Sequence, residues 1–419
     1  MVTVPNDQKE REHPSMQIVC TQSALLHVLA LLKRAIKETT DLPILSHVLL
    51  QAADGRVSLS ANNLEIGITC ELDTTGTVEE GAVAVPYARL QDLVEHLPTG
   101  VSARRRKSGD TTLAMETPED SSTLTVRSGR SRAVVFGMHA SEFPAVLGPG
   151  PGAAHQGLSF SLASGFLAGM VRKVAFAAAT SDKPNPILIG ILLYASGQAL
   201  TITARDAHRL AACTASLEEA VARECAVVIP AWTAAECAQV LASARPDTPV
   251  WLVIEEQRVQ VSFLLPRLLL STRLLLGEYP MGFRNHVKPS YVTRVVVETK
   301  GLAAAFKPLA QVARDDGDLV TLTLAAAPGS SNGAVSMSAQ SQNLGQQAEE
   351  VDAVSLEGEA AGAQLLLKYS QLEQVIAVLD APYLALEMRG PTDPMAVRPV
   401  GGDPGVQETY VLVPCVRKT

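Results

Sequence analysis

The chain is poor in aromatic residues and lacks the short motifs that mark nucleotide or zinc chemistry. Aromatics make up only 4% of the 419 residues, while hydrophobic residues reach 47%. We therefore expect cores built of leucine, valine and alanine. There is no GxxxxGK[ST] loop, no glycine-rich fingerprint after a strand and no HExxH pair. Since those motifs carry phosphate and zinc binding, the sequence predicts no cofactor, no metal and no enzyme.

Cysteine pairs with metal-ligand spacing and long apolar runs are also missing. The six cysteines are Cys20, Cys70, Cys213, Cys225, Cys237 and Cys415, and none forms a CxxC pair. Isolated cysteines in apolar segments are typical of buried thiols in a reducing compartment. No signal-peptide pattern and no uncharged run of about 18 apolar residues occurs. We expect a cytoplasmic protein without membrane contact.

Net positive charge is missing as well, because the formal net charge is −8. This excludes a protein coated in basic residues. It does not exclude binding to nucleic acid, because a protein needs positive charge only on the face that meets the phosphates. An acidic exterior would limit non-specific association.

The feature that organises the chain is an internal repeat, built on a strand, a turn and a second strand. Residues 187–195, the turn Ser196-Gly197 and residues 199–204 form a predicted hairpin. A matching phrase begins at Pro43, 143 positions before Pro186, and a more divergent copy covers 319–347. Because missing a repeat leads to the wrong fold, it takes precedence over local assignments.

Each predicted hairpin is flanked by two helical segments. The first helices are expected at 23–37, with Ser23 as its cap, at 164–178 and at 300–314, with a kink at Pro308. The second helices are expected at 87–97, 231–241 and 369–379. Residues 126–132 are expected to form a strand. One unit is thus helix, strands, helix and strands, an α+β domain of antiparallel sheets.

The repeat predicts three similar domains. Residues 1–15 are polar and are expected to be a disordered extension, with Met16 as a possible true start. The domains are expected at 16–150, 158–288 and 289–419. A proline- and glycine-rich stretch, 148–157, marks the first boundary.

Seven phrases in this order resemble the bacterial sliding clamp, the beta subunit of the replicative DNA polymerase. They are Leu42-Pro43-Ile44-Leu45, Asn62-Asn63-Leu64-Glu65-Ile66, 126–132 (VRSGRSR), Phe143-Pro144, 206–211 (DAHRLA), Tyr279-Pro280 and 410–414 (YVLVP). The resemblance covers about 16–416. It implies a DNA clamp fold, with two helices per domain on antiparallel sheets. It further implies a head-to-tail homodimer ring around double-stranded DNA, loaded by a clamp-loader ATPase and devoid of catalytic activity.

The resemblance implies a basic channel that holds DNA without reading its sequence, through contacts that release counterions. The candidates are Arg34, Lys37, Arg172, Lys173, Lys183, Lys307 and Arg314. Two phrases depart from the family pattern. Thr39-Thr40 stands where an arginine is usual, and Pro186-Ile187 stands where paired tyrosines are usual.

The resemblance also implies an apolar groove that captures short linear peptides of the polymerase and other proteins. The candidates are Leu188, Arg205, Ala207, His208, Arg209, Leu210, Pro249, Val411, Val413 and Pro414. Here Arg205 replaces a small hydroxyl residue, and the tail after Pro414 differs. Peptide preference is therefore expected to be shifted.

Three alternative interpretations compete with the replicative clamp. A diverged or mobile-element clamp would serve a different polymerase or repair partner. A hydrolase would use Asp206 and His208, but no nucleophile motif accompanies them. A structural protein would make no use of its channel charges. Of two further signals, the run 104–107 (RRRK) is interpreted as a solvated edge and 315–318 (DDGD) as a turn, since the full calcium-loop spacing is missing.

Overall fold

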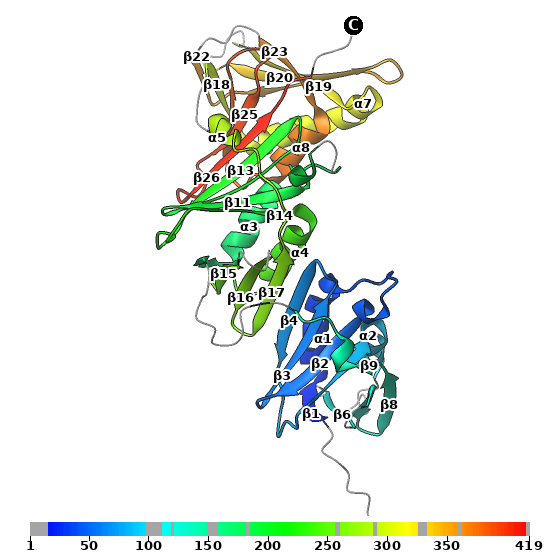
Figure 1. The fold of residues 1–419 in the computed structure, drawn as a ribbon. Coiled ribbons are helices and arrows are strands. Elements are labelled where there is room, and N and C mark those ends of the chain that lie inside the picture. The colour runs from blue at the N-terminus through cyan, green and yellow to red at the C-terminus, as the bar shows by residue number, and fades with distance from the viewer. Residues whose placement is uncertain are drawn as a thin grey trace, which may run out of the picture. The chain divides into compact units, whose positions relative to one another are not determined.

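The computed structural model describes residues 16–97, 111–118, 121–146, 148, 158–181, 185–255, 260–287, 291–325, 333–358 and 363–415. Its contacts gather into two compact units (Figure 1). The first unit holds Met1–Gly157 with Val250–Arg273, and the second holds Leu158–Pro249 with Leu274–Thr419. The expected extension 1–15 and the basic run 104–107 lie outside the described residues.

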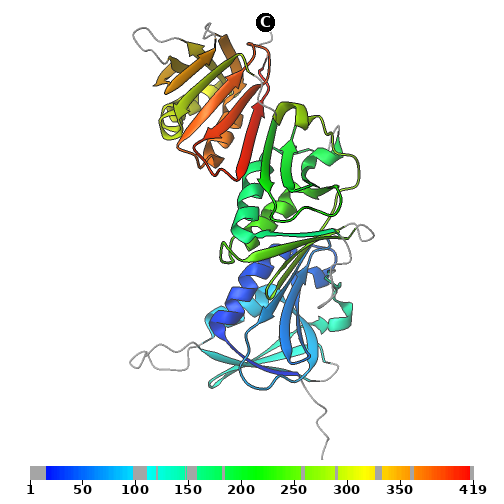
Figure 2. The ribbon, with the colours of Figure 1, turned by 90° about the vertical axis from the view of Figure 1, so that its left-hand side faces the viewer.

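The first unit is built from strands with two helices. Its elements are β1 (Met16–Thr21), α1 (Gln22–Leu32), η1 (Lys33–Ala35), η2 (Pro43–Ser46), β2 (His47–Ala53), β3 (Arg56–Asn62), β4 (Ile66–Leu72), β5 (Gly81–Pro86), α2 (Tyr87–His96), β6 (Thr112–Thr117), β7 (Thr123–Ser128), β8 (Ser131–Phe136), β9 (Met138–His139), η3 (Ala140–Glu142), β15 (Pro249–Glu255), β16 (Gln260–Leu265) and β17 (Leu268–Arg273). One antiparallel sheet has the order β1-β6-β7-β8, and another contains β15-β16-β17-β4-β3-β2-β5-β9. Helices α1 and α2 pack on each other, and α1 packs on β3 and β4 (Figure 2).

The second unit contains two further copies of the same motif. Its elements are β10 (Leu158–Ala163), α3 (Ser164–Ala175), η4 (Pro186–Ile189), β11 (Gly190–Ser196), β12 (Ala199–Arg205), β13 (Arg209–Ser216), β14 (Cys225–Pro230), α4 (Ala231–Leu241), α5 (Phe283–Val287), β18 (Thr293–Glu298), α6 (Thr299–Phe306), η6 (Lys307–Leu309), α7 (Ala310–Asp315), β19 (Leu319–Ala325), β20 (Ala334–Ser341), β21 (Gly345–Asp352), β22 (Ser355–Gly358), β23 (Ala363–Lys368), α8 (Tyr369–Val378), β24 (Tyr383–Met388), β25 (Met395–Val400) and β26 (Val406–Leu412). Helices α3 and α4 pack together, as do α6 and α8.

Strand β13 joins the second and third copies through its pairing with β26. The order β14-β11-β12-β13-β26-β25-β24-β18-β22 runs through one sheet, and β21-β20-β19-β23 forms another. Leu210 stands opposite Val411 in this register. One continuous sheet therefore carries residues that are about 200 positions apart in the chain.

Aliphatic side chains fill the cores, as the composition predicts. Leu25, Leu29 and Leu32 of α1 are at most 1% exposed. Burying a side chain of this kind stabilises the fold by roughly 1.5–3 kcal/mol. The few aromatics occupy special places, such as Phe306 and Tyr369, whose stacked rings are 4.4 Å apart.

The predicted helices are found, with differences at their ends. Helix α1 ends at Leu32 and continues as the 3-10 turn η1, so the expected end at Lys37 is wrong. Thr21, and not Ser23, caps α1, because its hydroxyl accepts a hydrogen bond from the Ala24 N–H at 3.3 Å. The break at Pro308 is confirmed, since η6 separates α6 from α7.

Two strand predictions need correction. The strand expected to start at Ile187 starts at Gly190, because Pro186–Ile189 forms a 3-10 turn, as does Pro43–Ser46 in the first copy. Proline fixes φ near −65° and lacks an N–H, which suits the start of such a turn. Residues 126–132 form the β7–β8 hairpin, which turns at Gly129 with φ +56°, rather than a single strand.

The cysteines form no disulfide within the described structure. Four of them are buried, and Cys225 and Cys415 are half-buried. Burial raises the pKa of the Cys70, Cys213 and Cys237 thiols to about 12, so these thiols are unreactive at neutral pH. Among the described residues, no helix is both long and apolar enough to span a bilayer.

Candidate functional site

An apolar cluster lies where the second and third copies share a sheet. Its buried members and the partly buried side chains packed on them, here called the Leu210 cluster, are Ile187, Leu192, Leu210, Ala212, Val228, Tyr279, Phe283 and Val411, with Leu188, Tyr194, Leu275 and Met281. Side chains alternate across a strand, so Leu210 and Ala212 face away from Cys213, which lies near Lys173 of α3. The cluster therefore occupies the sheet face opposite α3 and is covered by the segment 275–283.

A tight turn at Asp206 fixes the polar edge of the Leu210 cluster. The Asp206 carboxylate accepts hydrogen bonds from the backbone N–H groups of His208 at 2.7 Å and Arg209 at 2.9 Å. It also accepts from Arg209 Nε at 3.0 Å. Asp206 thus terminates β12 and orients the start of β13 through one side chain.

The same turn holds the C-terminal strand and helix α8. The Val413 N–H donates to the carbonyl of His208 in the turn at 2.8 Å. Two residues later, the Cys415 N–H donates to the carbonyl of Leu366 in β23 at 2.7 Å. The Arg209 guanidinium donates to Gln374 of α8 and lies 5.6 Å above the Phe176 ring. Arg209 is therefore a structural residue that connects three segments.

Arg205 and Tyr279 differ from these residues, because polar atoms of both are buried and neither makes a hydrogen bond to another side chain. Arg205 stands opposite Leu210 in the β12–β13 register, so its side chain shares the face of the Leu210 cluster. Within the described residues Arg205 Nε has no hydrogen-bond partner, while the Tyr279 hydroxyl makes no side-chain hydrogen bond and lies beside the Arg205 backbone. Burial raises the pKa of Tyr279, and the nearby charge of Arg205 partly offsets that rise.

The structure brings together most of the peptide-site residues predicted from the sequence. Leu188, Leu210 and Val411 belong to the Leu210 cluster, and the sheet register sets Arg205 beside it. The other candidates lie in the Asp206 turn or in the tail that is hydrogen-bonded to it through Val413: Ala207, His208, Arg209, Val413 and Pro414. Pro249 opens β15, is exposed and is not a member of the cluster.

Several members of the cluster were not predicted as site residues. Tyr279 and Phe283 lie far along the chain from the hairpin and reach it only because the segment 275–283 folds back. The signal that could have found them is the Glu-aromatic-Pro phrase, which closes both the first and the second copy at Phe143 and Tyr279.

The basic candidates on the first helices fall into two groups. Lys37, which follows η1, and Lys307, which opens η6, are exposed, whereas Arg34 is half-buried. Arg172 pairs with Asp380 at 3.3 Å and Arg314 with Glu373 at 2.9 Å, both on exposed surfaces. Exposed pairs of this kind contribute little stability and exchange readily for other charges. Lys183 lies outside the described residues.

Lys173 is different, because it is held in a buried polar network. Its side chain is 15% exposed, and its Nζ lies 2.6 Å from Glu408 Oε1. The Tyr410 hydroxyl donates to the other Glu408 oxygen at 2.8 Å. Burial, followed by the Glu408 charge, raises the pKa of Tyr410. Lys173 therefore ties α3 to β26 instead of standing free at a surface.

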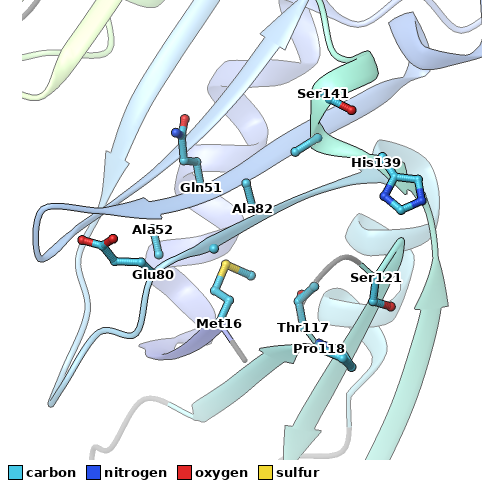
Figure 3. A pocket seen from close by; sticks show the side chains of 12 residues that line it. Met16, Gln51, Ala52, Glu80, Ala82, Thr117, Pro118, Ser121, His139 and Ser141 are labelled. Atoms are coloured by element: carbon cyan, nitrogen blue, oxygen red, sulfur yellow. The ribbon is translucent and has the colours of Figure 1, made fainter. Parts of the chain in front are cut away.

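A separate open cavity of about 540 Å³ in the first unit carries polar side chains but no catalytic arrangement (Figure 3). Met16, Glu80, Ser121 and His139 line it, and the Ser121 hydroxyl is 2.8 Å from Thr123. The hydrolase interpretation of Asp206 and His208 also fails on geometry. Asp206 binds the backbone N–H of His208, so the carboxylate does not orient the imidazole as a catalytic dyad requires.

Two family descriptions match this chain. The N-terminal domain of the DNA polymerase III beta subunit matches residues 16–147, and the central domain of the same subunit matches residues 161–281. The beta sliding clamp of Synechocystis sp. is 30% identical over 420 residues, which cover 95% of this chain and 99% of that protein. The chain belongs to the beta sliding clamp family of DNA polymerase III.

Solved structures agree with this membership. A sliding clamp from Pseudomonas aeruginosa is 25% identical, with a TM-score of 0.81 over 96% of this chain and 100% of that one. A sliding clamp from Bacillus subtilis has a TM-score of 0.82 at 22% identity, which shows the fold alone. The expected clamp fold is confirmed.

Family membership decides the general function. The clamp is a replication protein, the non-catalytic processivity subunit of DNA polymerase III. Clamps of this family act on DNA together with the polymerase and the clamp loader, and they form dimers. A diverged clamp with a different partner is not favoured by these comparisons.

Proposed function

We propose that two copies of this clamp close head to tail into a ring around double-stranded DNA. In this ring the first helices face the DNA, and partner proteins dock as short peptides on the Leu210 cluster. The observation that carries the proposal is a pair of edge strands of opposite character, β8 and β21, at the ends of two different sheets.

The two edge strands complement each other in charge. Strand β8 and the turn before it expose Arg132 and Arg130, whereas Arg127 of β7 pairs with Glu116 at 3.2 Å. Strand β21 reads GQQAEEVD and exposes Glu350 and Asp352. An edge strand presents unpaired backbone groups to any complementary strand, and opposite charges select the right one.

Strand β8 also carries an apolar contact surface. Val134 is 42% exposed and Phe136 is 78% exposed on the face that Arg132 shares. Exposed apolar residues grouped on an edge strand mark an interaction surface. Strands β8 and β21 are different surfaces of one chain. In the ring, β8 of one copy would therefore pair with β21 of the other copy. Such a heterologous contact closes into a ring when its rotation permits.

Channel contacts are assigned to the exposed basic residues of the first helices. Each repeat supplies at least one such residue. The first repeat has Lys37 between η1 and η2, the second has Arg172 in α3, and the third has Lys307 in η6 and Arg314 in α7. Contacts with phosphates through such side chains do not depend on base sequence, which permits sliding. Arg34, Lys173 and Lys183 complete the proposed set, and the burial of Lys173 gives it a supporting role.

Each copy of the repeat would form one domain of the clamp. Three domains at 16–150, 158–288 and 289–419 fit the threefold recurrence of a helix followed by a hairpin and a second helix. The clamp would act in the cytoplasm, and a clamp-loader ATPase would open the ring, since the chain has no nucleotide-binding motif of its own.

The ring is tested by mass in solution across dilution, combined with retention on circular and linearised DNA. We expect a dimer of twice 44.3 kDa that stays on circular DNA and runs off the ends of linear DNA.

Variants separate the interface from the channel. Arg132→Glu should weaken the dimer about tenfold, and adding Glu350→Arg should restore most of the loss. Lys37→Glu with Lys307→Glu should leave the dimer intact and shorten retention on circles. A monomer, or equal loss from circular and linear DNA, would overturn the proposal. Arg245→Glu, on the exposed turn after α4, is the control.

A further inference from the structure

We infer that Arg205 makes this clamp select partner peptides that place a carboxylate against the edge of the Leu210 cluster. The inference rests on the proposed peptide docking and goes further, because it assigns the chemistry of one peptide position. Arg205 would act as a specificity-determining residue, and Tyr279 would assist it.

Arg205 has an unused hydrogen-bond donor. Within the described structure its Nε has no hydrogen-bond partner, although that atom is shielded from solvent. The neighbouring carboxylate of Asp206 is occupied by Arg209 and by two backbone N–H groups. A buried donor without a partner is unfavourable, so a ligand that supplies an acceptor gains from satisfying it. The Tyr279 hydroxyl offers a second donor in the same cluster.

In the first copy of the repeat, the side chain at the same position has hydrogen-bond partners within the fold. Asn62 corresponds to Arg205, and both end the second strand of their hairpin, β3 or β12. Asn62 Nδ2 donates to the carbonyls of Pro144 at 3.2 Å and Ala145 at 2.9 Å, so it holds the covering segment in place. In the second copy the corresponding residue is Arg205, and its Nε has no partner. The fold of the second copy therefore forms without a hydrogen bond from this side chain.

The side chains around Arg205 also favour a carboxylate ligand. The Leu210 cluster supplies apolar side chains from Leu188, Tyr194 and Leu275 that remain partly open. Arg284 lies 4.4 Å above the Tyr194 ring, where it also forms an exposed ion pair with Glu224 at 3.6 Å. A guanidinium beside an apolar surface recognises carboxylates best, because its planar fork matches two carboxylate oxygens. The carboxylate would come from an acidic side chain or from the C-terminus of a peptide.

The test measures the affinity of full-length clamp for labelled octapeptides by fluorescence polarisation. All peptides share one leucine and one phenylalanine, and a single Glu is moved through the remaining positions. A second set carries Gln instead of Glu, and both sets are amidated at the C-terminus. A third set has Gln and a free C-terminus, which separates the two sources of a carboxylate.

We expect one carboxylate-bearing peptide to bind roughly tenfold more tightly than the matching amidated Gln peptide, as one charge-assisted hydrogen bond gives. That peptide carries either Glu at one position or a free C-terminus, and the ratio of the two affinities is the carboxylate preference. The preference should fall to within about twofold in Arg205→Gln, remain partial in Arg205→Lys and shrink in high salt. It should weaken in Tyr279→Phe and persist unchanged in the control Arg245→Gln.

Two results would overturn the inference, and they are distinguishable. If peptides bind but no peptide shows a carboxylate preference, or if the preference survives in Arg205→Gln, peptide docking stands and the role of Arg205 is wrong. If no peptide binds to wild-type clamp, the docking proposal itself fails. Dimer mass measured on each variant shows that the substitutions leave the fold intact.

Discussion

The first and second copies of the repeat use the same turn but treat the residue before it differently. Asn63 Oδ1 accepts from the N–H groups of Glu65 at 3.0 Å and Ile66 at 2.9 Å. Asp206 Oδ1 accepts from the corresponding N–H groups of His208 and Arg209. The preceding residue is Asn62 in one copy, with its side chain fully engaged, and Arg205 in the other, with its Nε unpaired.

This difference separates a structural use of the repeat from a recognition use. Both copies need the turn, because it connects two paired strands, β3 with β4 in the first copy and β12 with β13 in the second. Only the first copy uses the preceding polar side chain to fasten the segment that covers the sheet. In the second copy Tyr279 stands where Phe143 stands in the first, so one apolar anchor is replaced by one that carries a hydroxyl.

The largest difference between the copies should appear when the corresponding residues are truncated. Asn62→Ala removes two donated hydrogen bonds and one accepted from the Leu64 N–H at 2.8 Å. At roughly 1 kcal/mol for each bond, we expect a loss of about 3 kcal/mol in the free energy of unfolding. Arg205→Ala should change it by less than about 0.5 kcal/mol. Denaturant unfolding of both variants measures this, and equal losses would contradict the comparison.

A smaller difference should separate the two turn residues. Asn63→Ala removes a turn cap, which costs about 1 kcal/mol. Asp206→Ala removes the same cap and also leaves Arg209, whose side chain is 11% exposed, without its carboxylate. We therefore expect about 2 kcal/mol for Asp206→Ala. Asp206→Asn keeps the cap and should recover about half of that loss, as measured by the same unfolding experiment. Equal costs at the two positions would show that the Arg209 contact adds nothing.

The smallest effect is expected where the second copy is converted toward the first. Tyr279→Phe removes a buried hydroxyl that makes no side-chain hydrogen bond among the described residues and lies beside the Arg205 backbone, so stability should change by at most about 0.5–1 kcal/mol. The folded-state pKa of Tyr279 lies above the ordinary value of 10.0. Above pH 10 the unfolded chain loses this proton first, so stability falls as pH rises. Tyr279→Phe should reduce that alkaline loss in unfolding measured between neutral pH and pH 11, and a steeper loss would contradict it.

The sequence by itself determined the repeat, the places of its helices and hairpins, and the family. Periodicity and turn residues are local signals, so they fixed α2, α4, the β11–β12 hairpin and the break at Pro308. Local signals also explain the misplaced strand start at Ile187, because alternation alone does not distinguish a strand from a 3-10 turn that begins with proline.

Only the tertiary structure decided which side chains meet and which are available. Lys173 has the sequence features of a channel residue, yet β26 delivers Glu408 to it from 235 positions away. Tyr279 and Phe283 join the Leu210 cluster because a later segment folds back over the sheet. The sequence shows which residues are charged or polar. Whether a charge forms an ion pair, and whether a hydrogen-bond donor is buried, depends on neighbours that are distant along the chain. For that reason the unpaired Nε of Arg205 is visible only in the folded clamp.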